Sequence, residues 1–278
     1  MTRDPLTPTD VRRLLQEHGL APRKSSGQNF VVDPNTVRRI VEASGVGPDD
    51  TVLEIGPGLG SLTIPLLAAV RRVVAIEVDA GLVRVLQHLL GDEPGFTLLH
   101  ADAMRTDLAA AVDGGPATLV ANLPYNVATP LVMQALEAGP ALVEQYVMVQ
   151  REVGERWSAR VGDPLYSAVS VKVALSADAR IDLHVPRAVF HPVPNVDSVM
   201  VRIRRRDDAP SPEVRSRLAA LVDTAFAQRR KTLRNTLRTL APPEQLTAAF
   251  ADAGIDPGAR AETLTPEDFV RLAAALDA

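Results

Sequence analysis

The stretch "TVLEIGPGLGSLT", residues 51–63, decides the fold expected for this chain. Its first five residues suit a buried strand, glycines follow at 56, 58 and 60, and a helix can open directly afterwards. Glycine lets the backbone turn tightly and approach a ligand, with the N-terminus of a helix behind it. The spacing G-x-G-x-G is not the G-x-G-x-x-G dinucleotide fingerprint, and the absence of Lys-Ser/Thr excludes a Walker phosphate loop. The stretch therefore predicts a strand, a ligand-binding loop and a helix.

On both sides of this stretch, short apolar runs alternate with segments of helical pattern. The expected strands are 51–55, 72–78, 96–101, 117–122, 145–150, 168–175 and 198–204, and the expected helices among them include 9–18 and 34–44. After a charged, proline-containing break at 204–212, the expected elements are the helices 213–226, 228–240, 243–253 and 265–277. Unbroken apolar strands alternating with helices indicate a parallel sheet covered on both faces. We expect an α/β, Rossmann-like domain over 1–206 and a small all-α domain over 207–278.

Composition narrows the class of protein. Of 278 residues, 23% are charged and 46% apolar, as in soluble globular proteins. There is no cysteine, which excludes disulfides, thiolate nucleophiles and Cys-based zinc sites, and the five histidines show no metal-ligand spacing. The N-terminal "MTRDPLTPTD" is not a signal peptide, and no apolar run approaches the roughly 20 residues of a membrane-spanning helix. We expect a cytoplasmic monomer with no metal and no membrane partner.

Charge is unevenly distributed along the chain. The net charge is −4, but residues 200–240 contain eleven Lys or Arg against four acids, a local balance of +7. A local basic face is what meets phosphate, so a nucleic-acid partner stays open. The expected helix "QRRKTLRNTLR" (228–238) places Arg230, Arg234 and Arg238 about one turn apart on one face. This is typical of an RNA-backbone contact or, equally, of a solvated arginine-rich helix.

Two acids follow the first strand in a pattern typical of nucleoside sites. Glu77 ends the second strand, about 17 residues beyond Gly60, where a carboxylate can accept both hydroxyls of a ribose. Asp102 follows the third strand, where it can accept from an exocyclic amine such as adenine N6. Each acid alone would also suit a helix cap. Together with the glycine loop, at one sheet edge, they predict a pocket for an adenosine-like ligand, either a dinucleotide or S-adenosylmethionine.

A set of short motifs carries a resemblance to one family. The motifs, in order, are "GQNFVVD" (27–33), "LEIGPGLGSLT" (53–63), "IEVD" (76–79), "DA" (102–103), "NLPYN" (122–126), "VFHPVPNVDS" (189–198) and "FAQRRKTLRNTL" (226–237). From about residue 20 to the C-terminus the chain resembles the ribosomal RNA adenine dimethyltransferases, Rossmann-like class I enzymes that use S-adenosylmethionine. The residues of these motifs are most similar to those of the housekeeping branch of the family. Enzymes of that branch dimethylate N6 of two adjacent adenosines near the 3′ end of 16S rRNA in the 30S subunit.

The resemblance implies a role for individual residues. It places Asn29 and the Val31 backbone beside the methionine end of S-adenosylmethionine, Gly56 and Gly58 in the loop beneath it, and Asn122 near the methyl group. Glu77 would bind the ribose and Asp102 the adenine amine, and the product would be S-adenosylhomocysteine. Separately, the charge of the basic segment makes Arg229, Arg230, Lys231, Arg234 and Arg238 the candidates for RNA binding, and Arg23 and Lys24 would extend this surface. Val31 stands where Leu is common, a change that a backbone contact tolerates.

The implied chemistry explains the residue types in "ANLPYN" (121–126). Accepting hydrogen bonds from an adenine amine favours a pyramidal nitrogen whose lone pair is free, and the Asn122 side-chain oxygen and Leu123 carbonyl can act as acceptors. Pro124 stiffens the turn that holds them. Tyr125 and Phe190 would stack on the two faces of a base taken out of its helix. For Phe190, the alternative is a core position.

Three other functions are compatible with parts of the pattern. One is a 23S rRNA adenine N6-methyltransferase that confers antibiotic resistance, although those relatives typically carry "NIPY". Another is a ribosome-assembly factor in which methylation is secondary. The last is a dinucleotide-dependent oxidoreductase, which the glycine spacing disfavours.

Overall fold

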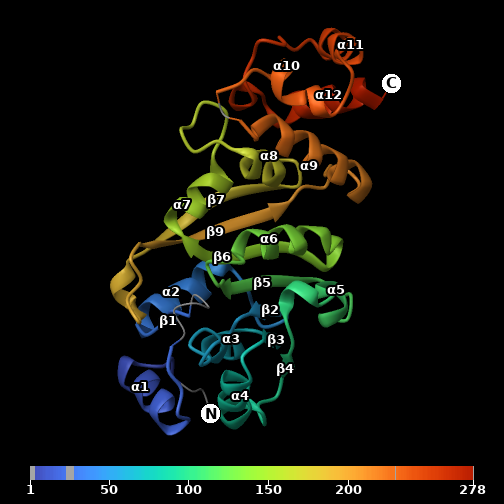
Figure 1. The fold of residues 1–278 in the computed structure, drawn as a ribbon. Coiled ribbons are helices and arrows are strands. Elements are labelled where there is room, and N and C mark those ends of the chain that lie inside the picture. The colour runs from blue at the N-terminus through green and yellow to red at the C-terminus, as the bar shows by residue number, and fades with distance from the viewer. Residues whose placement is uncertain (1–3, 23–27, 229, 278) are drawn as a thin grey trace. The chain divides into compact units, whose positions relative to one another are not determined.

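The computed structural model describes residues 4–22, 28–228 and 230–277, except for the side chain of Pro212. The chain forms two compact units (Figure 1). The first comprises Met1–Gly154 and Arg180–Arg204, and the second Glu155–Ala179 and Arg205–Ala278. The second segment of the second unit begins at Arg205, whereas the expected boundary follows residue 206; the unit also takes in Glu155–Ala179, which the expected domains placed in 1–206.

A mostly parallel sheet of seven strands organises the first unit. Its order is β4-β3-β2-β5-β6-β9-β7. The strands are β2 (Thr51–Ile55), β3 (Arg72–Glu77), β4 (Phe96–His100), β5 (Ala117–Asn122), β6 (Leu142–Gln150), β7 (Ala177–Val185) and β9 (Ser198–Arg205). β3 and β5 both pair with β2 in parallel, so the strand order reverses there. Ligands in open α/β sheets bind at the carboxyl ends of strands beside such a reversal. The predicted Rossmann-like α/β class is confirmed.

Helices and a two-stranded sheet complete the first unit. The helical segments are α1 (Pro8–Glu17), α2 (Pro34–Ser44), α3 (Thr63–Ala69), α4 (Ala80–Leu90), η2 (Ala103–Arg105), α5 (Leu108–Ala111), α6 (Ala128–Glu137), η3 (Gly139–Ala141) and η4 (Arg187–Val189), and α7 (Arg151–Ser158) begins in this unit. β1 (Phe30–Val31) pairs antiparallel with β8 (Phe190–His191). This pairing joins two of the family-like motifs. α2 has the predicted bounds, because Asp33 caps its first turn and Gly45 ends it at φ 78°.

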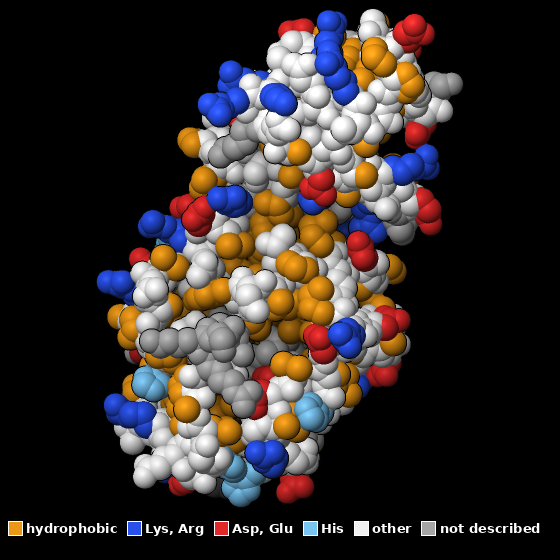
Figure 2. All heavy atoms as spheres, in the orientation of Figure 1, with side chains coloured by type: hydrophobic (Ala, Val, Ile, Leu, Met, Phe, Trp, Pro, Cys, Tyr) orange, Lys and Arg blue, Asp and Glu red, His pale blue; other side chains and the backbone are white. Residues whose placement is uncertain are grey.

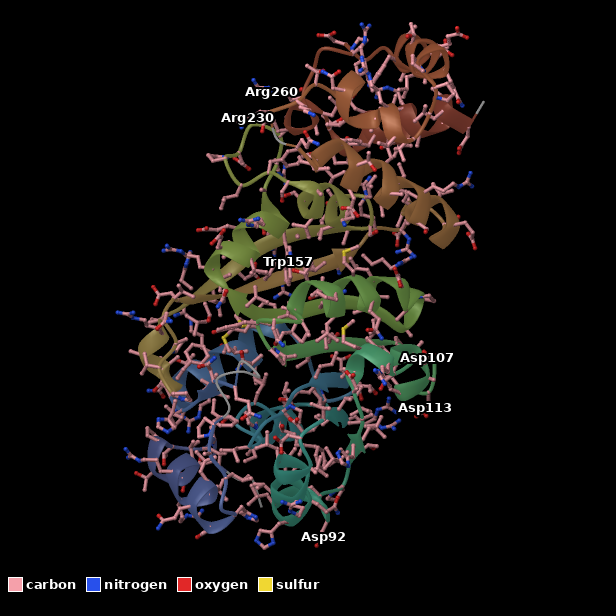
Figure 3. The ribbon with its side chains drawn as sticks, in the orientation of Figure 1. Asp92, Asp107, Asp113, Trp157, Arg230 and Arg260 are labelled. Carbon is pink, nitrogen blue, oxygen red and sulfur yellow. The ribbon has the colours of Figure 1, made fainter. Side chains whose placement is uncertain are left out.

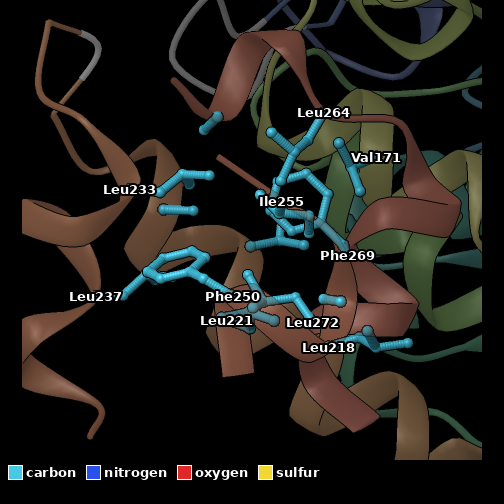
Figure 4. Packing of buried hydrophobic residues seen from close by; sticks show 14 of the residues in the cluster. Val171, Leu218, Leu221, Leu233, Leu237, Phe250, Ile255, Leu264, Phe269 and Leu272 are labelled. Atoms are coloured by element: carbon cyan, nitrogen blue, oxygen red, sulfur yellow. The ribbon is translucent and has the colours of Figure 1, made fainter. Parts of the chain in front are cut away.

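The second unit is helical and has a hydrophobic core of its own. Its elements are α8 (Ala168–Ala174), α9 (Pro212–Phe226), α10 (Leu233–Thr236), η5 (Leu237–Thr239), α11 (Pro243–Ala253), η6 (Ala261–Thr263) and α12 (Pro266–Asp277). Figure 4 shows the core, in which Val171 of α8 belongs to the same cluster as Phe250 and Phe269. The predicted all-α C-terminal region is confirmed.

Two predicted elements are wrong. The alternating apolar pattern of 168–175 suggested a strand, but Ser167 and Ser170 form a capping box that opens α8, and Val171 and Leu175 lie one turn apart in the helical core. The continuous helix over 228–240 is also absent. The Leu233 N–H donates to the Ala259 carbonyl at 2.9 Å instead of to a preceding turn, so helix resumes only at Leu233.

Candidate active site

A pocket of about 360 Å³ lies at the carboxyl ends of β2, β3 and β5. All seven residues predicted to bind the cofactor line it: Asn29, Val31, Gly56, Gly58, Glu77, Asp102 and Asn122. Leu123 and Pro124 line it too. The pocket therefore brings together the N-terminal motif, the glycine loop and the loop after β5, which are far apart in sequence.

The glycine loop needs its glycines for conformation and for space. Gly56, Gly58 and Gly60 have φ of 71°, 63° and 89°, a region that other residues rarely adopt. A Cβ on Gly58 would stand 2.9 Å from the Phe30 ring, and one on Gly56 would stand 3.6 Å from Pro124. The glycine loop thus lies between Phe30 and Pro124, which belong to two other motifs that line the pocket.

Glu77 is held at the end of β3 by backbone donors. One carboxylate oxygen accepts from the N–H groups of Val78 and Asp79, both at 2.9 Å, and the other accepts from Gly58 at 3.2 Å. A carboxylate has about four lone-pair positions, so one acceptor position remains for a ligand hydroxyl. Burial raises the pKa of Glu77, although these three hydrogen bonds oppose that effect. The side chain is preorganised to accept from a ligand.

Asp102 follows β4 at the same edge. Its Oδ1 accepts from the Met104 N–H at 3.0 Å, and its Oδ2 lies 3.7 Å from Arg105 Nε. About half of the side chain is exposed. The turn it opens is fixed by Gln134 of α6, whose Nε2 donates to the carbonyls of Ala103 and Thr106 at 3.1 and 2.8 Å. Asp102 thus offers a carboxylate acceptor at a turn that Gln134 holds in place.

The Asn122 side chain connects two motifs across the pocket. Its Nδ2 donates to the Asn29 carbonyl at 2.9 Å. A carbonyl can only accept, so this contact fixes which end of the amide points at Asn29 and directs Oδ1 elsewhere. The neighbouring Leu123 is anchored through its own N–H, which donates to the Met148 carbonyl at 3.1 Å. Asn122 and Leu123, the two residues predicted to accept hydrogen bonds from the target amine, are therefore each fixed through an N–H group, and their oxygen atoms are not used in these contacts.

Neither of the two predicted stacking residues lines the pocket, and they differ in burial. The Tyr125 side chain is half-buried and shares a 2.8 Å hydrogen bond with Ser198 Oγ, and burial raises its pKa. Phe190 is 2% exposed and packs in a cluster with Val31, Tyr146 and Met200, so it does not line the pocket. The predicted stacking role of Phe190 is not supported by this position, because pairing of β8 with β1 turns its side chain into the core.

Glu54, a buried carboxyl, was not among the predicted site residues. It lies in β2, lines the pocket and is 1% exposed. Burial raises its pKa to about 8, a neighbouring Thr63 hydroxyl opposes that rise, and the Glu77 charge adds to it. The sequence signal was the acid inside an otherwise apolar strand, "TVLEI".

Comparison with known proteins decides the family. The family model for ribosomal RNA adenine dimethylase matches residues 19–278. The chain belongs to this family. It is 50% identical over 274 residues to ribosomal RNA small subunit methyltransferase A of Thermobifida fusca, covering 96% of this chain and 95% of that protein. The protein of the same name from Streptomyces griseus is 47% identical, with 96% and 94% covered.

Solved structures of adenine dimethylase relatives share the fold. The 23S rRNA methyltransferase ErmE is 28% identical, with a TM-score of 0.67 over 90% of this chain and 100% of that one. A dimethyladenosine transferase from Plasmodium falciparum is 25% identical, with a TM-score of 0.74 over 87% and 95%. The identity to small-subunit methyltransferases is much higher than to the 23S enzyme, so the 23S alternative is the weaker one.

The basic segment at residues 228–240 is arranged differently from the prediction. Arg230, Lys231, Arg234 and Arg238 are exposed, but Arg230 precedes α10, so the three arginines do not form one helical stripe. Arg234 N donates to the Pro257 carbonyl at 3.1 Å, which brings the turn before Arg260 to this segment. Figure 3 labels Arg230 and Arg260 in this part of the second unit, and Figure 2 shows several Lys and Arg side chains on its visible face. Arg23, Lys24 and Arg229 lie outside the described residues.

Two further findings concern the described part of the chain. No cluster of three or more His, Asp or Glu side chains that could hold a metal ion occurs in it. Within the same residues, no helix is both long enough and apolar enough to span a membrane.

Proposed function

We propose that this chain transfers methyl groups from S-adenosylmethionine to N6 of two adjacent adenosines near the 3′ end of 16S rRNA, within the cytoplasmic small ribosomal subunit. The product would be N6,N6-dimethyladenosine, made as part of ribosome biogenesis. One observation carries the proposal: the acceptors Glu77, Asp102 and Asn122 converge on one pocket, in a member of the adenine dimethylase family. Relatives 45–50% identical that are named small-subunit methyltransferases support the choice of 16S rRNA.

The pocket residues fit S-adenosylmethionine, which supplies an activated methyl group when bound. Glu77 has one acceptor position left for a ribose hydroxyl, and the half-exposed carboxylate of Asp102 can accept from the adenine amine. The glycine loop leaves no side chain between the backbone and the ligand, and the Asn29 and Val31 backbones would bound the methionine end.

Asn122 and Leu123 position the target amine. Asn122 Nδ2 is anchored on the Asn29 carbonyl, so Oδ1 can accept one hydrogen of the adenine amino group, and the Leu123 carbonyl can accept the other. Pro124 stiffens the turn, and Tyr125, which follows it and is fixed through Ser198, would stack on one face of the base as the base enters beside the pocket. Preorganised acceptors and alignment of the nitrogen with the methyl group carry the rate, with no strong general base.

The exposed cations of the second unit are suited to the RNA backbone. Arg230, Lys231, Arg234 and Arg238 belong to the predicted set, and the fold adds Arg260. Phosphate contacts of this kind position a substrate, while the folded shape of the RNA selects it.

Substrate choice is tested by offering labelled S-adenosylmethionine with either unmodified 30S subunits or 23S rRNA. The proposal expects label in the 30S subunits; label confined to 23S rRNA would establish the resistance-type activity instead. Asn122→Ala tests the site, because it removes one acceptor and should lower kcat by about 10²-fold or more. RNA affinity should be nearly unchanged, and equal losses in kcat and affinity would contradict the assigned role.

A further inference from the structure

The side-chain amide of Gln134, in α6, donates to two carbonyls of a single turn. Its Nε2 lies 3.1 Å from the Ala103 carbonyl and 2.8 Å from the Thr106 carbonyl. Both carbonyls belong to the short turn that Asp102 opens, and Ala103 lines the pocket proposed for the cofactor. Gln134 does not line that pocket itself. Any effect of Gln134 on the cofactor must therefore pass through this turn.

The protein uses the Gln134 amide for its donors alone. The Oε1 atom of the same amide is buried and has no hydrogen-bond partner among the described residues. A buried polar atom without a partner is unfavourable, so it needs an explanation. Turning the amide over would place Oε1 against two carbonyls, which can only accept, so the orientation of the amide is fixed. This position therefore requires donors, and Gln134 supplies two of them although its own acceptor stays unpaired.

Other acceptors of the pocket are fixed by contacts that do not involve Gln134. Backbone N–H groups hold the Glu77 carboxylate at the end of β3. The Asn122 amide is anchored on the Asn29 carbonyl. The Asp102 side chain, by contrast, is about half exposed, and its turn is tied to α6 through Gln134. Loss of the Gln134 donors should therefore disturb the acceptor for the cofactor's adenine and leave the acceptor for the target amine in place.

We propose that Gln134 is a positioning residue for the adenine of the cofactor and that it acts through Asp102. This inference rests on the proposed function, because it assumes S-adenosylmethionine as the cofactor. The two hydrogen bonds from Gln134 hold the turn where the Asp102 carboxylate can accept from the adenine amine. Gln134 thus sets the affinity for the cofactor and the preference for a base that carries an amine. It does not set the rate of methyl transfer once the cofactor is bound.

Calorimetry with two ligands tests this role. S-adenosylhomocysteine and its analogue with purine in place of adenine, which has a hydrogen where the amine was, are each titrated into the full chain. The unaltered protein should prefer S-adenosylhomocysteine, because only this ligand can donate to Asp102. Gln134→Met keeps an unbranched side chain but has no N–H group. It should raise the Kd of S-adenosylhomocysteine about tenfold, the order expected for one or two hydrogen bonds, and leave that of the analogue nearly unchanged.

A matched control separates this role from a general loosening of α6. Gln145 of β6 is buried, donates through Nε2 to the Val132 carbonyl of α6 at 3.3 Å, and also has an Oε1 without a partner among the described residues. Gln145→Met should therefore leave the affinity for S-adenosylhomocysteine unchanged. In an Asp102→Ala background, Gln134→Met should add no further loss. With unmodified 30S subunits, Gln134→Met should raise the KM for S-adenosylmethionine and leave kcat at saturation unchanged.

The outcomes separate this inference from the proposed function. Equal weakening of both ligands by Gln134→Met, or a full further loss in the Asp102→Ala background, would overturn the role of Gln134 and leave the methyltransferase proposal intact. An unchanged Kd for S-adenosylhomocysteine would overturn it too. Should Gln134→Met fail to fold, Gln134→Glu, which replaces the donors by acceptors, carries the same comparison. Failure of S-adenosylhomocysteine to bind the unaltered protein would refute the cofactor itself, and the inference with it.

Discussion

The ligand-free protein should lose stability as pH rises from about 5 to 8, and Glu54→Gln should remove much of that loss. Burial raises the pKa of Glu54 from 4.5 to about 8 in the folded chain. Above pH 4.5 the unfolded chain therefore sheds a proton that the folded chain retains, which favours unfolding. The stabilising contribution is complete below pH 4.5 and is lost as pH rises through about 8.

The size of the effect follows from linkage. Each pKa unit corresponds to about 1.36 kcal/mol, so the shift of Glu54 corresponds to about 5 kcal/mol over the whole range. Between pH 5.5 and 7.5, the free energy of unfolding should fall by about 2–3 kcal/mol more in the unaltered protein than in Glu54→Gln. Because Glu77 is present in both proteins, most of its own contribution cancels in this difference.

Hydrogen exchange of the β2 and β3 amides is the assay, because it reports on the unit that contains Glu54. Opening free energies are measured for both proteins, without ligand, at pH 5.5, 6.5 and 7.5, with Glu137→Gln as a charge-loss control. Profiles that stay parallel across this range would show that Glu54 is ionised in the folded protein, and the reasoning from burial would be refuted.

Three further perturbations test other parts of the structure. Gly58→Ala should weaken cofactor binding measured by calorimetry, because its Cβ would meet the Phe30 ring at 2.9 Å; Gly114→Ala, at a similar φ of 68° in open space, is the control and should bind normally. Arg234→Gln should weaken RNA binding and lower the slope of log K against log salt by about one, and an unchanged slope would remove it from the RNA contact. Arg202→Met should lower the free energy of unfolding by about 2–3 kcal/mol, since the half-buried carboxylates Glu144 of β6 and Asp182 of β7 lose this hydrogen-bonded cation and keep only the exposed Arg204 and Arg180; a loss below about 1 kcal/mol in urea unfolding would contradict this.

Much of the sheet and the pocket could be predicted because local signals agree with the fold. Asp33, Pro34 and Gly45 mark both ends of α2, and its bounds match the prediction. Glycines followed by acids at successive strand ends share one edge of a parallel sheet by geometry alone, so Glu77 and Asp102 were predictable as pocket residues.

The errors arise where tertiary contacts override a local pattern. The apolar alternation of 168–175 suits a strand, but the core of the second unit takes Val171 and Leu175 from one helical face. The basic segment has the sequence pattern of one continuous helix. In the structure, the N–H groups of Leu233 and Arg234 donate instead to carbonyls in the turn before Arg260. The core residues that pack against 168–175 and the turn that binds the basic segment are both distant in sequence, so the periodicity of either segment could not reveal these contacts.

Mass mapping of methylated adenosines is the direct test of whether this chain dimethylates 16S rRNA. Unmodified 30S subunits are incubated with the protein and S-adenosylmethionine, and the 16S rRNA is digested and sequenced by mass spectrometry. We expect N6,N6-dimethyladenosine at two adjacent positions near the 3′ end. Methylation at any other position, or only on 23S rRNA offered in parallel, would contradict it.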